Sequence, residues 1–112
     1  MSFRDAQKDV DDWAQQFRVP YWQPLEIMAR LAEETGEIAR ELNHMYGPKK
    51  KKAEEDVADL GDEITDVFMT LICLANSQNI NLDEHWKRLV YKLHDRDTAR
   101  YEKRDEERGN ST

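Results

Sequence analysis

Apolar side chains recur along this chain at every third or fourth position, the spacing that places them on one side of an α-helix. The recurrence divides the sequence into four segments, which span residues 3–17, 24–46, 54–77 and about 82–100. No stretch alternates apolar and polar residues with a period of two, and no Asn-Gly or Asp-Gly turn occurs. The pattern therefore predicts an all-α fold, a four-helix bundle-like domain with short loops.

Local signals mark where the predicted helices begin and end. Ser2, followed three positions later by Asp5, is a variant of the capping box that starts a helix. Pro24 suits the first turn of the second helix, where its missing N–H costs nothing. The pair Gly47–Pro48 is expected to end that helix. A basic loop, Lys49–Lys52, follows, and the sequence leaves its role open.

Length and charge narrow the class of protein. The chain has 112 residues, typical of one domain, which we expect to occupy residues 1–101 and to be followed by a polar tail, 102–112. The formal net charge is −7, which argues against a nucleic-acid-binding surface and against docking on anionic membranes. No apolar run approaches the roughly 20 residues of a membrane span. The single cysteine, Cys73, lies in an apolar run, so we expect a cytoplasmic protein with a buried, unreactive thiol.

Two pairs of carboxylates stand out on the second and third predicted helices. Glu34 and Glu37 are three residues apart and therefore share one side of a helix. Glu63 and Asp66 repeat the same spacing on the next helix. If the two helices face each other, the pairs gather around one point. A set of oxygen ligands suits a hard cation such as Mg²⁺ or Mn²⁺.

The alternative interpretation is an ordinary solvated acidic surface. Glu34 argues against it, because this carboxylate lies within the apolar stripe that contains Leu31 and Ile38, where an uncompensated charge is costly. Compensating charge is also scarce on the third helix, since no Lys or Arg occurs between Lys52 and Lys87. These grounds favour a metal site, although a plain acidic surface stays open.

The order Glu33-Glu34-x-x-Glu37, a spacer, and then Glu63-x-x-Asp66 resembles the signature of MazG-type nucleoside triphosphate pyrophosphohydrolases. The similarity extends over about residues 3–101 and is greatest to the small stand-alone bacterial members. It implies that Glu34, Glu37, Glu63 and Asp66 bind Mg²⁺, and that Glu33 holds or deprotonates a water. The implied reaction is cleavage of a (deoxy)nucleoside triphosphate to the monophosphate and pyrophosphate, for house-cleaning or for control of nucleotide pools.

The same resemblance suggests where a nucleotide binds. Tyr21 and Trp22 precede the first metal-binding helix, and aromatic rings stack on bases of any identity. In relatives, this segment and a residue one or two turns beyond the second metal-binding glutamate line the base pocket; here that residue is His44. The alternatives are structural: Tyr21 and Trp22 close one end of the bundle, and His44 caps a helix.

A basic pair on the fourth predicted helix is a candidate for binding phosphates. Lys92 and Arg96 are four residues apart and resemble the basic C-terminal motif of the family, and Arg100 follows one turn later. The alternative is that these cations pair with neighbouring acidic residues such as Asp97 on the surface.

Family members associate, so the resemblance also implies a homodimer or a dimer of dimers. Two alternative interpretations of the carboxylates stay open. A di-iron bundle needs a Glu-x-x-His motif on two helices, and this chain has one, Glu41 to His44. A non-catalytic acidic helical module that dimerises and binds a protein partner is the second. The sequence does not decide the preferred base, the sugar, or whether the nucleotide is canonical or aberrant.

Overall fold

The structure is a computed structural model that describes residues 1–48 and 53–104, with the side chains of 53–58 left outside that description. Within these residues it contains four α-helices and no strand, so the predicted all-α class is confirmed. The helices are α1 (Phe3–Ala14), α2 (Pro24–Tyr46), α3 (Ala53–Ser77) and α4 (Leu82–Lys92). The loop Lys49–Lys52 and the end of the predicted tail lie outside the described residues.

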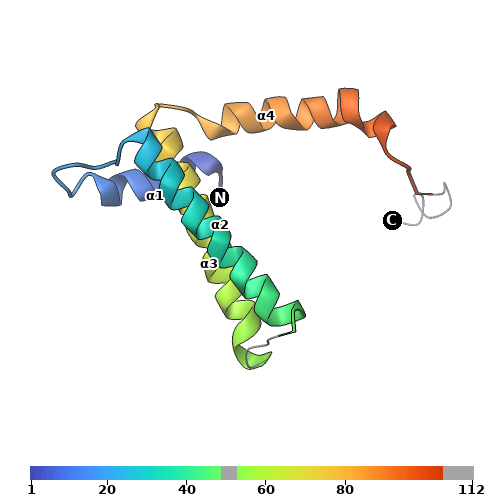
Figure 1. Ribbon diagram of the computed structural model, residues 1–112. Coiled ribbons are helices and arrows are strands. Elements are labelled where there is room, and N and C mark those ends of the chain that lie inside the picture. Colours follow the sequence, from blue (N-terminus) through green and yellow to red (C-terminus); the bar gives the residue numbers. More distant parts are fainter. Residues whose placement is uncertain (49–52, 105–112) are drawn as a thin grey trace. The chain divides into compact units, whose positions relative to one another are not determined.

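The chain divides into two compact units, and the first of them, Met1–Asn81, holds α1, α2 and α3. In this unit α2 and α3 lie side by side and run in opposite directions (Figure 1). The shorter α1 packs on α3, at the end of the pair where α2 begins and α3 ends (Figure 1). Residues in the middle of α2 therefore face residues in the middle of α3.

The predicted start signals of the first two helices are present. The Ser2 hydroxyl accepts a hydrogen bond of 3.1 Å from the Asp5 N–H, and the Ser2 N–H donates one of 2.9 Å to the Asp5 carboxylate. α2 begins at Pro24, and the backbone N–H of Gln23 donates to the Glu26 carboxylate at 3.0 Å. Both helix starts thus satisfy backbone donors that have no partner inside the helix.

The first helix is shorter than the sequence pattern predicts, since it ends at Ala14 and not at Phe17. Beyond that point the N–H groups of Gln16 and Phe17 donate to carbonyls three residues back, at 3.3 and 3.1 Å, so the last turn tightens. Phe17 instead belongs to the loop, where its ring meets that of Trp13 edge-on with centroids 4.9 Å apart. Helical spacing alone did not distinguish a helical Phe17 from a ring that folds back over the helix end.

The C-terminal end of α3 closes with a left-handed residue. Asn79 has φ 56°, a conformation that asparagine tolerates better than most non-glycine residues. The N–H of Ile80 then reaches back to the carbonyl of Ala75 at 2.9 Å, a bond that satisfies one of the last helical carbonyls. This bond and the left-handed Asn79 end α3.

A polar network joins α1, α3 and the loop before α2. The buried Gln7 amide donates to the Asn76 side-chain oxygen at 2.9 Å and to the Ile80 carbonyl at 2.7 Å. Asn76 donates in turn to the Gln7 carbonyl and to the Tyr21 hydroxyl, both at 3.0 Å. Tyr21 donates to the Asp11 carboxylate at 2.5 Å. These bonds fix one end of the first unit because buried polar groups are costly to leave unpaired.

The apolar core of the chain is small. Its buried apolar residues, among the described side chains, are Ala14, Ile27, Ile72 and Ala75. Several residues that the pattern predicts to face a core are about two-fifths exposed: Ile64 (40%), Leu71 (40%) and Leu42 (41%). The reason is geometric, since α1 covers one end of the α2–α3 pair and leaves much of its length open.

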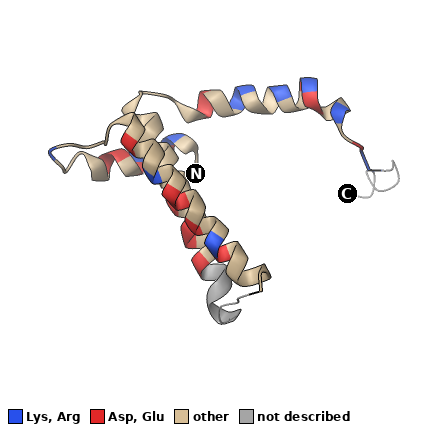
Figure 2. Cartoon of the chain, viewed as in Figure 1, with Lys and Arg blue, Asp and Glu red and all other residues tan. Residues whose placement is uncertain are grey.

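The second unit begins at Leu82 and consists of α4, a π-helical turn (Leu93–Asp97) and a 3₁₀ turn (Thr98–Arg100). None of the residues in these three elements is buried. Basic residues recur along α4, whereas acidic residues dominate the described length of α2 and α3 (Figure 2). Across the described residues, no helix combines the length and the apolar character that crossing a membrane requires.

The polar network gives the first prediction. Asn76→Ala removes the shared partner of Gln7 and Tyr21, so we expect it to lower the free energy of unfolding by roughly 1–3 kcal/mol. The control Gln78→Ala removes an exposed amide two residues later and should change that free energy by less than about 0.5 kcal/mol. Urea unfolding followed by circular dichroism measures both, and equal effects of the two variants would contradict the proposed importance of the network.

Candidate metal centre and the adjoining cavity

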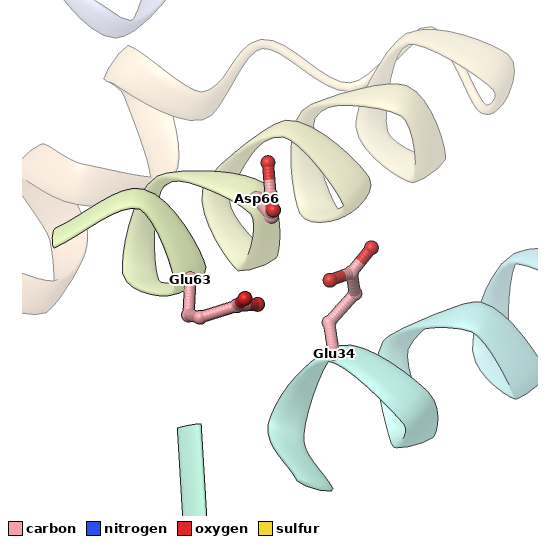
Figure 3. Close-up of side chains that lie close together, drawn as sticks. All are labelled: Glu34, Glu63 and Asp66. Atoms are coloured by element: carbon pink, nitrogen blue, oxygen red, sulfur yellow. The ribbon is translucent and has the colours of Figure 1, made fainter. Parts of the chain in front are cut away.

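Three of the four predicted metal ligands come together in the middle of the first unit. Glu34 on α2 and Glu63 and Asp66 on α3 each offer a carboxylate oxygen, and these three atoms all lie within 4.8 Å of one another (Figure 3). Glu34 is buried, with 6% of its surface exposed, whereas Glu63 is partly buried and Asp66 is exposed. The antiparallel arrangement of the two helices is what brings the pairs face to face.

The electrostatics of the cluster are those of concentrated negative charge. Partial removal from water raises the pKa of Glu63, and the nearby carboxylates of Glu37, Asp66, Glu34 and Glu41 raise it further. A divalent cation among these oxygens would remove both the repulsion and the unfavourable burial. Carboxylate oxygens are also the donors that hard cations prefer, so the residues present fit such an ion.

Arg30 supplies positive charge to the cluster from within α2. Its Nε donates to Glu34 Oε1 at 2.8 Å, and its Nη1 lies 3.5 Å from Glu33 Oε2. Half of the Arg30 side chain is exposed, while that of Glu34 is almost fully buried. Arg30 was not among the residues predicted for the site, although its spacing of four from Glu34 is the helical ion-pair spacing that reveals it.

A cavity of about 690 Å³ opens beside the carboxylates. Its polar part is formed by Arg30, Glu34, Asp66, Thr70 and Cys73. Its apolar and aromatic walls come from the end of α1, the following loop and the two long helices: Trp13, Phe17, Val19, Pro20, Tyr21, Trp22, Ile27 and Met69. This volume lies within the range of roughly 300–1,000 Å³ that small-molecule sites occupy.

Comparison with known proteins bears on this arrangement. The family model of the MazG nucleotide pyrophosphohydrolase domain matches residues 23–101 of this chain. That range contains both carboxylate pairs and all of the residues that form the polar part of the cavity. The chain belongs to the MazG nucleotide pyrophosphohydrolase family.

Individual relatives agree with that assignment. The chain is 47% identical over 105 residues to YpjD of Bacillus subtilis (strain 168), a match that covers 94% of this chain and 95% of that protein. The crystal structure of YPJD from Bacillus subtilis superposes with a TM-score of 0.75 at 48% identity, covering 83% of this chain and 95% of that one. A second crystal structure, of the Bacillus-conserved MazG protein, a nucleotide pyrophosphohydrolase, gives a TM-score of 0.73 at 39% identity, covering 88% and 96% of the two chains.

The two other glutamates of this MazG signature lie at the edge of the cluster. Glu37 is about half exposed and has Arg40 at 3.9 Å, and it lies outside the group of three converging oxygens. Its carboxylate nevertheless has the largest charge effect on the pKa of Glu63. Because the helices are antiparallel, the residue three positions after Glu34 on α2 faces the residue three positions before Asp66 on α3, which is Glu63. Glu33 points to the more exposed side, where its nearest cation is Arg30.

Tyr21 and Trp22, which precede α2, both line the cavity. The Tyr21 hydroxyl is held between Asp11 and Asn76, so it is fixed in place by the first unit itself. Burial and the hydrogen bond to Asp11 raise the pKa of Tyr21 to about 12. Tyr21 therefore stays neutral at physiological pH and offers the cavity its ring.

His44 does not lie at the cavity in this chain. It is ten residues beyond Glu34 on the same helix, which corresponds to about 15 Å at a rise of 1.5 Å per residue. It belongs to the last turn of α2, and its Nδ1 is buried without a hydrogen-bond partner among the described residues. The structure thus separates His44 from Tyr21 and Trp22 within one chain.

The predicted phosphate-binding residues belong to the second unit. Arg96 Nε donates to Asp97 Oδ1 at 3.1 Å, and Arg100 Nη1 reaches the same oxygen at 3.1 Å. These hydrogen bonds hold the pKa of Asp97 below its usual value. The surface pairing that the sequence left as an alternative is therefore present for Arg96 and Arg100, while Lys92 lies in the last turn of α4.

Several residues of the cavity were not predicted. Thr70 and Cys73 lie four and seven residues beyond Asp66, the spacing of one helix side, which was the available signal. The Thr70 hydroxyl donates to the Asp66 carbonyl at 3.0 Å. Cys73 is only partly buried, whereas the sequence predicts a buried thiol, and this partial burial raises the pKa of the thiol.

The raised pKa of Glu63 gives a prediction about stability. The folded protein binds the proton of the Glu63 carboxyl group more tightly than the unfolded chain does, so protonation of Glu63 stabilises the fold. This stabilisation is fully present below the ordinary pKa of 4.5 and is lost as pH rises through the higher pKa of the folded protein. We expect Glu63→Gln, which carries no charge, to have a higher Tm than the unaltered protein at pH 7 in the presence of a chelator. The difference should close below about pH 4.5.

Differential scanning calorimetry from pH 4 to 8, in steps of about 0.5 pH units, tests this expectation. The control is Asp62→Asn, which removes an exposed carboxylate from the neighbouring position of α3. It should show a smaller dependence on pH. If the gain in Tm of Glu63→Gln stayed constant across this range, it would not come from loss of the Glu63 charge, and the prediction would be contradicted.

Proposed function

We propose that this MazG-family chain is a Mg²⁺-dependent hydrolase that cleaves nucleoside or deoxynucleoside triphosphates to the monophosphate and pyrophosphate. One observation carries the proposal: three carboxylates converge, and two of them, Glu34 and Asp66, line the polar side of an aromatic-walled cavity. The carboxylates suit a cation that accompanies a triphosphate, and the walls suit a planar base. Removal of aberrant nucleotides or control of nucleotide pools would both use this reaction.

Glu34, Glu63 and Asp66, with Glu37 from the next turn of α2, are the proposed ligands of Mg²⁺, or of Mn²⁺ in its place. Their oxygens are hard donors, and their mutual repulsion leaves them in need of a cation. When bound, the ion neutralises charge on the triphosphate and polarises the attacking water. Glu33 is the proposed residue that orients or deprotonates this water, because it adjoins the cluster and stays accessible to solvent.

The aromatic walls are the proposed site of the base. Rings stack on any base, and each stacked base contributes about 1–3 kcal/mol. Trp22 is the best placed of the predicted residues because it lines the cavity and is more than half exposed. His44 lies too far along α2 to share this cavity, so its proposed contact with the base requires a second subunit.

Lys92 and Arg96 are the proposed phosphate contacts of the second unit. Their charges suit a triphosphate, and Arg96 would exchange the Asp97 carboxylate for a phosphate oxygen. Such an exchange involves an ion pair on the surface, where pairs contribute little and are readily given up.

Pyrophosphate release across the common ribo- and deoxyribonucleoside triphosphates tests the proposed reaction. We expect activity with Mg²⁺, and a loss of at least about a hundredfold in Asp66→Asn, because one ligand oxygen loses its charge. Asp62→Asn, which lies on the same helix outside the cluster, should retain most of the activity. Full activity of Asp66→Asn at ordinary Mg²⁺ concentrations would remove this residue from the site. If neither Mg²⁺ nor nucleotides changed the Tm of the protein, the result would favour the non-catalytic module.

We further propose that the protein is at least a dimer. Large apolar side chains stay exposed on both units, including Leu25 (84%) and Tyr46 (77%) on α2 and residues Phe68 and Trp86 on α3 and α4. Large exposed apolar side chains are candidates for burial between subunits, because soluble monomers rarely expose large apolar patches. Light scattering coupled to gel filtration should give at least twice the mass of one chain. Elution as a monomer at micromolar concentration would contradict this expectation.

A further inference from the structure

Arg30 occupies a position in the cavity that the proposed function does not yet use. Of the residues that line the cavity, it is the one with a cationic side chain. It lies on α2 between Ile27, on the apolar wall, and Glu34, in the carboxylate cluster. It is four positions before Glu34, so the two backbones lie about 6 Å apart along the helix axis.

The facing helix gives the same placement. From the facing residues Glu34 and Asp66, a step of four toward the start of α2 leads to Arg30, and a step of four toward the end of α3 leads to Thr70. Both residues line the cavity. Arg30 and Thr70 therefore mark the level between the cation-binding carboxylates and the aromatic walls.

The guanidinium group of Arg30 is only partly used. Its Nε donates to the buried Glu34 at 2.8 Å, and its contact with Glu33 is long, at 3.5 Å, and exposed. Arginine has five N–H donors in a planar fork, so donors remain for a further anion. Half of the side chain is open to solvent, which leaves such an anion access.

We propose that Arg30 is a substrate-contacting residue, which neutralises Glu34 in the free protein and donates to the α-phosphate of the bound nucleotide. The inference rests on the proposed function, since it takes the base to lie on the aromatic walls and the triphosphate to lie over the carboxylates. In a nucleoside triphosphate, the α-phosphate is the part of the triphosphate that is bonded to the sugar, and the sugar carries the base. Arg30 lies at the corresponding level of the cavity.

Charge balance explains why the contact would change on binding. A guanidinium beside a divalent cation is repelled by it unless an anion lies between them. The α-phosphate supplies that anion, and Arg30 can hold it while keeping its Nε bond to Glu34. The alternative role is purely one of positioning, in which Arg30 only orients Glu34 for the cation. The two roles predict opposite effects on cation binding in the absence of nucleotide.

Isothermal titration calorimetry of the 112-residue chain separates these roles. The first titration uses Mn²⁺ alone, and the second uses α,β-methylene analogues of a purine and a pyrimidine triphosphate with Mg²⁺, which resist cleavage at the α–β linkage. The variants are Arg30→Gln and Arg30→Lys. The control Arg40→Gln removes the same charge from α2, at a residue that pairs with Glu37 at 3.9 Å but does not line the cavity.

We expect Arg30→Gln to weaken binding of both analogues about ten- to hundredfold, the range of a hydrogen bond between charged groups. The loss should be similar for the two bases, since a phosphate contact carries no base information. Arg30→Lys should fall between, because a lysine keeps the charge and loses the fork. Mn²⁺ binding should be unchanged or tighter in Arg30→Gln, and Arg40→Gln should bind both analogues within about twofold of the unaltered protein.

Other results would overturn the proposal. Weaker Mn²⁺ binding in Arg30→Gln, by the same factor as the analogues, would assign Arg30 to the positioning of Glu34. Unchanged binding of every ligand would make the Arg30–Glu34 contact a surface ion pair without a role in recognition. If the unaltered protein bound neither analogue, the proposed function itself would fail. Circular dichroism of each variant confirms that the helices are retained.

Discussion

Repulsion between the carboxylates of α2 and α3 is the interaction to which the rest of the first unit is adjusted. Where two long helices meet, apolar side chains normally fill the contact, yet here Glu34 is buried in it and faces Glu63 and Asp66. The pairing must therefore be held from elsewhere. Ile27, Ile72 and Ala75 supply apolar contacts nearer the end where α1 packs, and Arg30 offsets one charge within the cluster. The buried apolar residues are thus concentrated at one end of the pair, and the candidate metal centre lies beyond it.

The polar network at that end also decides what the cavity can offer. Gln7 and Asn76 tie α1 to the end of α3, and Asn76 together with Asp11 fixes the Tyr21 hydroxyl. Because that hydroxyl is already paired, Tyr21 contributes a ring and no free hydrogen bond to a ligand. The walls around it are aromatic or aliphatic. A ligand on this side of the cavity would meet mainly ring area and shape, whereas polar groups are available at the level of Arg30, Thr70 and the carboxylates.

Much of this arrangement could be predicted from the sequence, and the rest could not for identifiable reasons. The helices and the paired carboxylates depend on local spacing, so the periodic pattern and the resemblance to MazG proteins were sufficient. Phe17 continues the helical period but belongs to the loop, because its contact with Trp13 is made after the helix has ended. Spacing of four exposes the Arg30–Glu34 pair, but only the fold shows that a cavity opens beside it. His44 was placed by its distance from a motif, and the straight course of α2 carries it away from the aromatic walls.

The distribution of charge connects the fold to the proposed reaction. The described part of the first unit gathers carboxylates along α2 and α3, while basic residues recur along α4 in the second unit (Figure 2). A triphosphate and a divalent cation together present both signs of charge, so each needs a different part of the protein. The cluster at Glu34, Glu63 and Asp66 suits the divalent cation. Arg30 is the positively charged side chain that lines the cavity beside this cluster. An acidic protein can thus bind a highly anionic substrate, provided that the cation binds with it and that arginine lies where the phosphate chain meets the nucleoside.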